Sequence, residues 1–222
     1  EEQYEQEYEC SFEAAIIGAY YGKQMAAIER DKRICGVPYD PSALVYTAWD
    51  LGIRDATAIW FAQIIGREIH LIDFYENSGV GIEHYVNVIR SKPYAYASHI
   101  MPHDAQAKEF GTGMTRLEVM EKLKLEPLRV CPIHRVEDGI NAVRMKLPMM
   151  WFDATKCETG TGALKLYRAE WDENRKALKP NPVHDWSSHA ADAMRYLCMA
   201  LDGQIDSNAF NRRLTYPKSG VA

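Results

Sequence analysis

Three consecutive β-rich runs, separated by very short breaks, place the strongest constraint on the fold. The runs cover residues 44–50, 56–64 and 67–75, and the breaks fall at residues 52–55 and at Gly66. Short apolar runs bounded by turn residues are typical of strands. Breaks of this length join antiparallel neighbours, because a parallel pair needs a crossover of about a dozen residues or more. The sequence therefore predicts three antiparallel strands in hairpin order.

Helical and strand patterns alternate after these strands. We expect helices at residues 82–89, 115–123, 135–146 and 185–201, and strands at residues 94–100, 128–131 and 149–152. Antiparallel strands that lead into alternating helices and strands predict an α/β fold with a mixed β-sheet flanked by helices. This pattern differs from that of a doubly wound dinucleotide-binding fold.

The chain divides into three segments where its pattern changes. Apolar residues at helical spacing, such as Phe12, Ile16 and Met25, predict a helical lead-in, and a cluster of helix breakers follows at residues 36–41. We expect a helical linker at residues 1–40, the main domain at residues 41–205 and a flexible basic tail at residues 206–222. Because the chain opens without Met inside a helical pattern, we expect it to be a fragment of something longer.

The net charge leaves nucleic-acid binding open. The 222 residues carry 31 acidic and 26 basic side chains, for a formal net charge of -5. Five of the acidic residues lie among the first nine positions, so the rest of the chain is balanced. A balanced chain neither supports nor excludes a DNA partner, because a local cationic groove is sufficient.

The cysteines and the apolar runs indicate a cytoplasmic protein. Five cysteines are scattered without a C-x-x-C pair, which favours reduced thiols over a disulfide framework or a thiolate zinc site. No apolar run is long enough to span a bilayer, and no signal segment opens the chain. We therefore expect a soluble protein with no membrane contact.

Two carboxylates follow predicted strands. Asp50 ends an apolar strand, and Asp104 follows a short strand within the sequence PHDA. A buried carboxylate is costly unless a partner such as a cation compensates its charge. The structural alternatives are that Asp50 serves the turn at Gly52 and that Asp104 caps the next segment.

The helix predicted at residues 185–201 carries a third acidic group. His189 and Asp192 are three positions apart, so they project from one face of this helix. The alanines around them allow the helix to lie close to a sheet. Asp185 and Ser187 are interpreted as helix caps. Considered alone, His189 would be interpreted as a core histidine.

Three carboxylates, on two strand ends and one helix face, suit two-metal cleavage of a phosphodiester bond. Two hard cations about 4 Å apart activate water and stabilise the leaving oxygen. Oxygen ligands favour Mg²⁺ or Mn²⁺. Such a site requires that folding bring the three carboxylates together.

Several motifs resemble the large subunit of phage terminases. EYECSFEAA at residues 7–15, with GAYYG at residues 18–22, resembles the segment that joins the ATPase and nuclease domains. WDLGIRDATA at residues 49–58 resembles the first nuclease strand and hairpin. PHDA at residues 102–105 and HAADA at residues 189–193 resemble the second and third acidic motifs.

This resemblance implies a ribonuclease H-like nuclease domain in which Asp50, Asp104 and Asp192 bind Mg²⁺ or Mn²⁺, with two ions expected. Similarity to Holliday-junction resolvases makes His189 a fourth ligand or a proton-transfer group. Many terminases carry two adjacent carboxylates where this chain has Ser188 and His189. The motor ATPase is expected upstream, because residues 18–23 do not form a phosphate-binding loop.

The implied function is a metal-dependent DNA endonuclease that cuts concatemeric viral DNA when genome packaging begins and ends. The implied partners are double-stranded DNA, the terminase small subunit and the portal protein, on the viral procapsid in the host cytoplasm. Two alternatives stay open: a resolvase-like or transposase-like nuclease of the same fold, and a non-catalytic docking domain for the portal or small subunit. Candidate phosphate contacts are Lys122, Lys124, Arg144, Lys146, Arg175, Lys176, Lys179, Arg212, Arg213 and Lys218.

Overall fold

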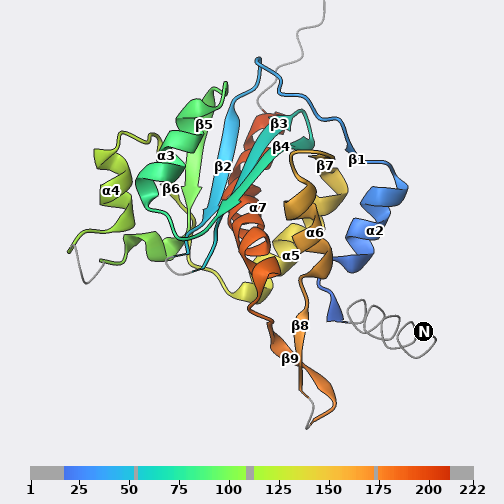
Figure 1. Ribbon diagram of the computed structural model, residues 1–222. Helices are drawn as coiled ribbons and strands as arrows, with labels where there is room; N and C mark the ends of the chain where they lie inside the picture. Colours follow the sequence, from blue (N-terminus) through green and yellow to red (C-terminus); the bar gives the residue numbers. More distant parts are fainter. Residues whose placement is uncertain (1–17, 53–54, 109–112, 173–174, 211–222) are drawn as a thin grey trace, which may run out of the picture.

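The computed structural model describes residues 18–52, 55–108, 113–172 and 175–210. The predicted lead-in before residue 18, with its motif at residues 7–15, lies outside the described residues. So do Arg212, Arg213 and Lys218 of the predicted tail. The described residues form a large sheet, helices on both of its faces and a separate two-stranded hairpin (Figure 1).

The large sheet is mixed, as the sequence predicts, and has seven strands: the six predicted ones and β1. The strand order is β1-β7-β4-β3-β2-β5-β6. The bounds are β1 Ile34–Cys35, β2 Val45–Asp50, β3 Thr57–Ile65, β4 Glu68–Asn77, β5 Tyr96–Met101, β6 Leu128–Val130 and β7 Met150–Asp153. Strands β2, β3 and β4 pair antiparallel, and every pairing outside them is parallel. The three predicted antiparallel strands therefore form the centre of the sheet.

Helices cover both faces of this sheet (Figure 1). Helices α2, α5, α6 and α7 contribute to the core on one face, and α3 and α4 to the core on the other. The bounds are α2 Gly22–Arg30, α3 Ile82–Ser91, α4 Arg116–Lys122, α5 Val136–Lys146, α6 Glu158–Leu166 and α7 Trp186–Phe210, with short 3-10 turns at His103–Gln106 and Leu147–Met149. Among the described helices, none is long and apolar enough to cross a membrane.

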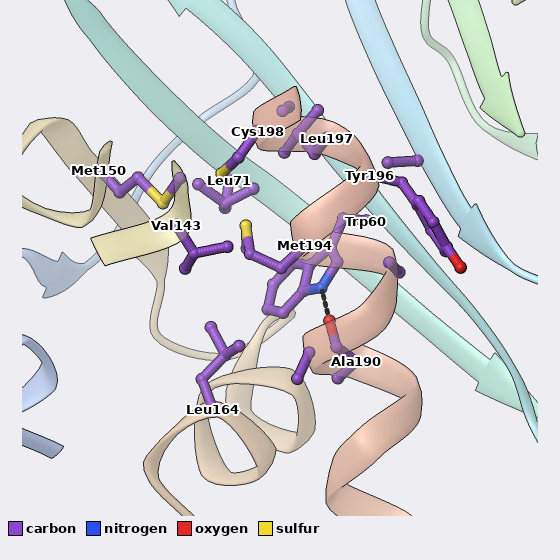
Figure 2. Close-up of a cluster of buried hydrophobic side chains, with 14 of the residues drawn as sticks. Trp60, Leu71, Val143, Met150, Leu164, Ala190, Met194, Tyr196, Leu197 and Cys198 are labelled. Atoms are coloured by element: carbon purple, nitrogen blue, oxygen red, sulfur yellow. Dashed lines mark hydrogen bonds between the residues drawn. The ribbon is translucent and has the colours of Figure 1, made fainter. Parts of the chain in front are cut away.

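Strand β3 is buried on both faces, which explains its continuous apolar run. Ala58 and Trp60 belong to the core beneath α7, whereas Ile59 and Phe61 belong to the core beneath α3. Successive side chains of a strand point to opposite faces. Figure 2 shows Trp60 within the larger core, among side chains from α5, α6 and α7.

One α-helix and three strands form where the sequence analysis predicts none: α6, β1, β8 (Ala169–Asp172) and β9 (Ala177–Pro182). Helix α6 has the sequence ETGTGALKL, whose glycines and threonines have low helix propensity. The hairpin of β8 and β9 has two prolines in β9, which disfavour a strand assignment. The hairpin extends away from the large sheet (Figure 1).

The described part of the predicted linker packs into the same core as the sheet. Met25 and Ile28 of α2 are 1% and 2% exposed, and β1 pairs with β7. At the other end, the backbone of α7 stays helical to Phe210, beyond the predicted start of the tail. The division of the chain at residues 40 and 205 stays a prediction.

Candidate active site

Asp50 and His189 are in direct contact at the C-terminal end of β2, an inner strand of the sheet. Asp50 is the last residue of β2, and its Oδ2 lies 3.2 Å from Nδ1 of His189 in α7. Both side chains are mostly buried. Helix α7 can lie this close to the sheet because Ala190 and Ala191, which follow His189, are fully buried and small.

The electrostatics of this pair follow from burial and contact. Burial raises the pKa of Asp50 to about 6; the hydrogen bond to His189 opposes this rise, and the nearby Asp192 carboxylate adds to it. The pKa of His189 is raised, first by its hydrogen bond to Asp50. The contact thus favours the protonated imidazole of His189, while burial favours the protonated carboxyl of Asp50.

Asp192 lies one helical turn beyond His189 and is paired with a cation. Its Oδ1 lies 2.7 Å from Nη2 and 3.1 Å from Nε of Arg195. The side chain of Asp192 is 25% exposed and that of Arg195 is 7% exposed. The charge of Asp192 raises the pKa of Asp50, but the Asp192 carboxylate itself is paired with Arg195.

Asp104 lies beside the pair rather than in contact with it. Strands β2 and β5 are parallel neighbours, with Ala48 opposite Ile100. Asp50 is the last residue of β2, and the turn that carries Asp104 follows the end of β5, so both lie at the same end of the sheet. Asp104 is exposed, and its Oδ2 lies 4.0 Å from Nη1 of Arg116.

Tyr196 links the three predicted carboxylates. Burial raises the pKa of its hydroxyl, and the charges of Asp50, Asp192 and Asp104 raise it further, in that order. The charges of the three predicted carboxylates therefore all act on one buried phenol, and Arg195 opposes them.

Glu76, near the end of β4, is a site residue that the sequence analysis missed. Asp50 is opposite Ala58 in β3, and Ala58 is opposite Glu76, so the two carboxylates are aligned on one face of the sheet. Burial raises the pKa of Glu76, His189 lowers it and Asp50 raises it. The small side chain of Ala58 lies between them. Only the register of the β3–β4 hairpin could have placed Glu76 in line with Asp50. A bulge between Phe61 and Ala62 shifts that register.

The donors fit a hard divalent cation by their chemistry. Carboxylate oxygens are the ligands that Mg²⁺ and Mn²⁺ prefer, whereas an imidazole nitrogen suits softer metals, so the fit rests on the carboxylates. In the part of the chain that the structure describes, no three His, Cys, Asp or Glu side chains converge into a ready-made metal site. The structure thus brings Asp50 and His189 together and leaves Asp104 and Asp192 at the margins of the site.

Asp185 has the structural role that the sequence predicts. Its Oδ1 accepts a 2.9 Å hydrogen bond from the backbone nitrogen of Ser187 in the first turn of α7. Its Oδ2 lies 3.1 Å from Nη1 of Arg168. It is the N-cap of α7, which confirms the capping interpretation for Asp185. Ser187 is not a cap: it lies inside the first turn, and its hydroxyl donates to Asp185.

Several candidate phosphate contacts have partners within the fold. Nε of Arg144 donates to the backbone oxygen of Tyr20 at 2.9 Å, and Lys146 is 7% exposed. Nζ of Lys179 lies 2.6 Å from Oε1 of Glu170 in the β8–β9 hairpin. The DNA-contacting role of the candidate cations stays a prediction.

The mixed seven-stranded sheet with helices on both faces has the ribonuclease H-like fold. The large terminase of a thermophilic bacteriophage matches with a TM-score of 0.58 and 17% identity, over 78% of this chain and 43% of that chain. The nuclease domain of the P22 large terminase matches with a TM-score of 0.59 and 19% identity, over 76% of this chain and 88% of that chain. The nuclease domain of the bacteriophage SPP1 large terminase, solved with bound Mn, matches with a TM-score of 0.52 and 18% identity, over 69% of this chain and 84% of that chain.

These likenesses establish the fold of this chain as that of large-terminase nuclease domains and confirm the predicted ribonuclease H-like architecture. The chain spans less than half of the thermophilic phage terminase that it matches. No protein-family model and no curated protein sequence matches it.

Proposed function

We propose that this domain is a metal-dependent DNA endonuclease that cuts concatemeric viral DNA at the start and the end of genome packaging. The observation that carries the proposal is the 3.2 Å contact between Asp50 and His189. The contact lies next to the end of β5, and the turn that follows β5 carries Asp104. The likeness to large-terminase nuclease domains, one of them solved with bound Mn, supports it. The proposed partners are double-stranded DNA, a terminase small subunit and a portal protein, on a procapsid in the host cytoplasm.

We assign Asp50, Asp104 and Asp192 as the carboxylates that would hold Mg²⁺ or Mn²⁺. The burial of Asp50 fits this role, because a divalent cation would compensate a carboxylate that is poorly solvated. When bound, the metal supplies an activated water and neutralises charge on the phosphate. His189 orients Asp50 through Nδ1 and can hold a proton at that atom, because the hydrogen bond to Asp50 raises its pKa.

A plasmid assay tests this function. Incubation of the chain with supercoiled plasmid and Mg²⁺ or Mn²⁺ is expected to give nicked and linear products, and excess EDTA is expected to stop the reaction. Cleavage that persists in EDTA would contradict the proposal. A docking domain would leave the plasmid intact with either metal.

A second substrate separates the two nuclease alternatives. A packaging nuclease is expected to cut linear duplex DNA as readily as a four-way junction, because its proposed substrate is unbranched concatemeric DNA. Strong preference for the junction would favour the resolvase-like alternative.

A further inference from the structure

The pairing of Asp192 with Arg195 distinguishes this carboxylate from the other two. Both Nη2 and Nε of Arg195 lie within 3.1 Å of Oδ1 of Asp192. Asp50 instead contacts the imidazole of His189, which can lose its proton, and Asp104 is exposed. A metal ion that binds Asp192 must therefore share or displace a permanently charged guanidinium.

The surroundings hold Arg195 in this position. The residue is 6% exposed, and its guanidinium carbon lies 5.8 Å from the ring centroid of Tyr196. Helix α5 leaves space for the side chain at Gly139, where a Cβ atom would lie 3.1 Å from Cδ of Arg195. Because a buried guanidinium is costly without a counter-ion, Arg195 cannot give up Asp192 without an energetic penalty.

The charge of Arg195 also acts on the rest of the site. It lowers the pKa of Asp50, opposing the effect of Asp192 on the same carboxylate. Arg195 thus supplies from within the fold part of the positive charge that a second metal ion would bring.

We propose that Arg195 is a positioning residue that holds Asp192 and lowers the affinity of the site for a second divalent ion. The first ion then binds at Asp50 and Asp104, and the second binds only when Asp192 shares its carboxylate between Arg195 and metal or exchanges Arg195 for metal. This inference rests on the proposed function in one respect, that the site binds Mg²⁺ or Mn²⁺.

Titration of the complete chain with Mn²⁺, followed by electron paramagnetic resonance of the free ion, measures the number and affinity of bound ions. The wild-type chain is expected to bind one ion tightly and a second at least about tenfold more weakly, and Arg195→Met is expected to strengthen the second step by about tenfold. Asp192→Asn is expected to remove the second step and keep the first. Arg195→Lys, which keeps the charge, is expected to stay close to wild type.

Two equal steps in the wild-type chain, an unchanged second step in Arg195→Met, or loss of the first step in Asp192→Asn would each overturn the inference. If Arg195→Met does not fold, Arg195→Gln serves as the neutral variant, with the same expected strengthening of the second step.

Thermal melts in EDTA give a readout that does not depend on metal. Asp192→Asn is expected to melt lower than wild type, because Arg195 keeps its charge in a buried position without its carboxylate. The double variant Arg195→Met with Asp192→Asn is expected to recover part of that loss. A double variant that melts lower than Asp192→Asn would contradict the idea that the Arg195 charge causes the loss.

The two proposals fail in different ways. A wild-type chain that binds Mn²⁺ in the expected two steps but does not cut DNA would refute the proposed function and support the inference about Arg195. A chain that cuts DNA but binds two ions with equal affinity would refute the inference alone.

Discussion

The indole nitrogen of Trp60 in β3 donates a 2.8 Å hydrogen bond to the backbone oxygen of Ala190 in α7 (Figure 2). Ala190 follows His189 directly, so this bond fixes the part of α7 that carries the candidate site. The far edge of the same indole packs against Gly160 of α6, where an added Cβ would lie 2.4 Å from Trp60 Cη2. Trp60 therefore positions α7 and requires a glycine in α6.

Gly160→Ala is expected to destabilise the domain by about 2 kcal/mol or more, because overpacking forces the indole or α6 to move. An added Cβ would also lie 3.0 Å from Phe74, so the indole has little space in which to shift. Chemical denaturation measures the loss. We also expect weaker cleavage, since displacement of Trp60 disturbs the contact between Asp50 and His189.

Gly162→Ala is the matched control for this substitution. Gly162 lies in the same helix, and a Cβ there would meet nothing within 4 Å. Alanine has higher helix propensity than glycine, so this variant is expected to gain about 0.5–1 kcal/mol. Equal effects at the two positions would show that the Trp60 contact does not explain the glycine at position 160.

His99 is expected to make stability depend on pH. It is 1% exposed, its Nδ1 lies 2.7 Å from the hydroxyl of Thr47, and burial lowers its pKa to about 4. In the unfolded chain its pKa is about 6.5, so between these values the unfolded state binds a proton that the folded state does not. Stability should therefore fall as pH falls from about 6.5 to about 4, by on the order of 3 kcal/mol.

Urea denaturation of wild type and His99→Gln at pH 7 and pH 5 measures this contribution. The variant is expected to be less stable than wild type at pH 7 but to lose less stability on acidification. The same loss in both proteins would contradict the assignment to His99.

Asp185→Ala is expected to lower the free energy of unfolding by about 1 kcal/mol, because α7 loses its N-cap. The salt bridge to Arg168 is lost with it. Since Asp185 is a cap and not part of the proposed catalytic set, most of the cleavage activity should remain. Loss of cleavage without loss of stability would mean that Asp185, and not Asp192, is the functional aspartate of this helix.

Six strands of the large sheet, β2 to β7, and most of the helices were predictable from sequence because their signals are local. The apolar run of β3 and the helical spacing in α3 reflect which faces are buried, and burial pattern is encoded residue by residue. Helix α6 was not predictable, because Gly160 and Gly162 weaken its helical signal. Gly160 is required by a distant tryptophan, which is a tertiary constraint.

The candidate site was predictable in part for the same reason. Asp50 at a strand end and His189 beside small alanines could be singled out, and folding places them in contact. Glu76 could not, because its alignment with Asp50 depends on pairings across two strands. Arg195 is three positions from Asp192, a spacing that allows a helical ion pair, but its burial became visible only in the fold.

Replacement of Asp50 tests the central claim most directly. With Mn²⁺, the wild-type chain is expected to nick and linearise plasmid DNA, and Asp50→Asn is expected to reduce cleavage to background. In EDTA at about pH 7.5, Asp50→Asn should melt at the same or a higher temperature. The reason is that burial raises the pKa of Asp50 to about 6, above its unfolded value of about 3.9, so the ionised carboxylate opposes folding above that pH. Cleavage by Asp50→Asn at the wild-type rate, or no cleavage by the folded wild-type chain, would contradict the account.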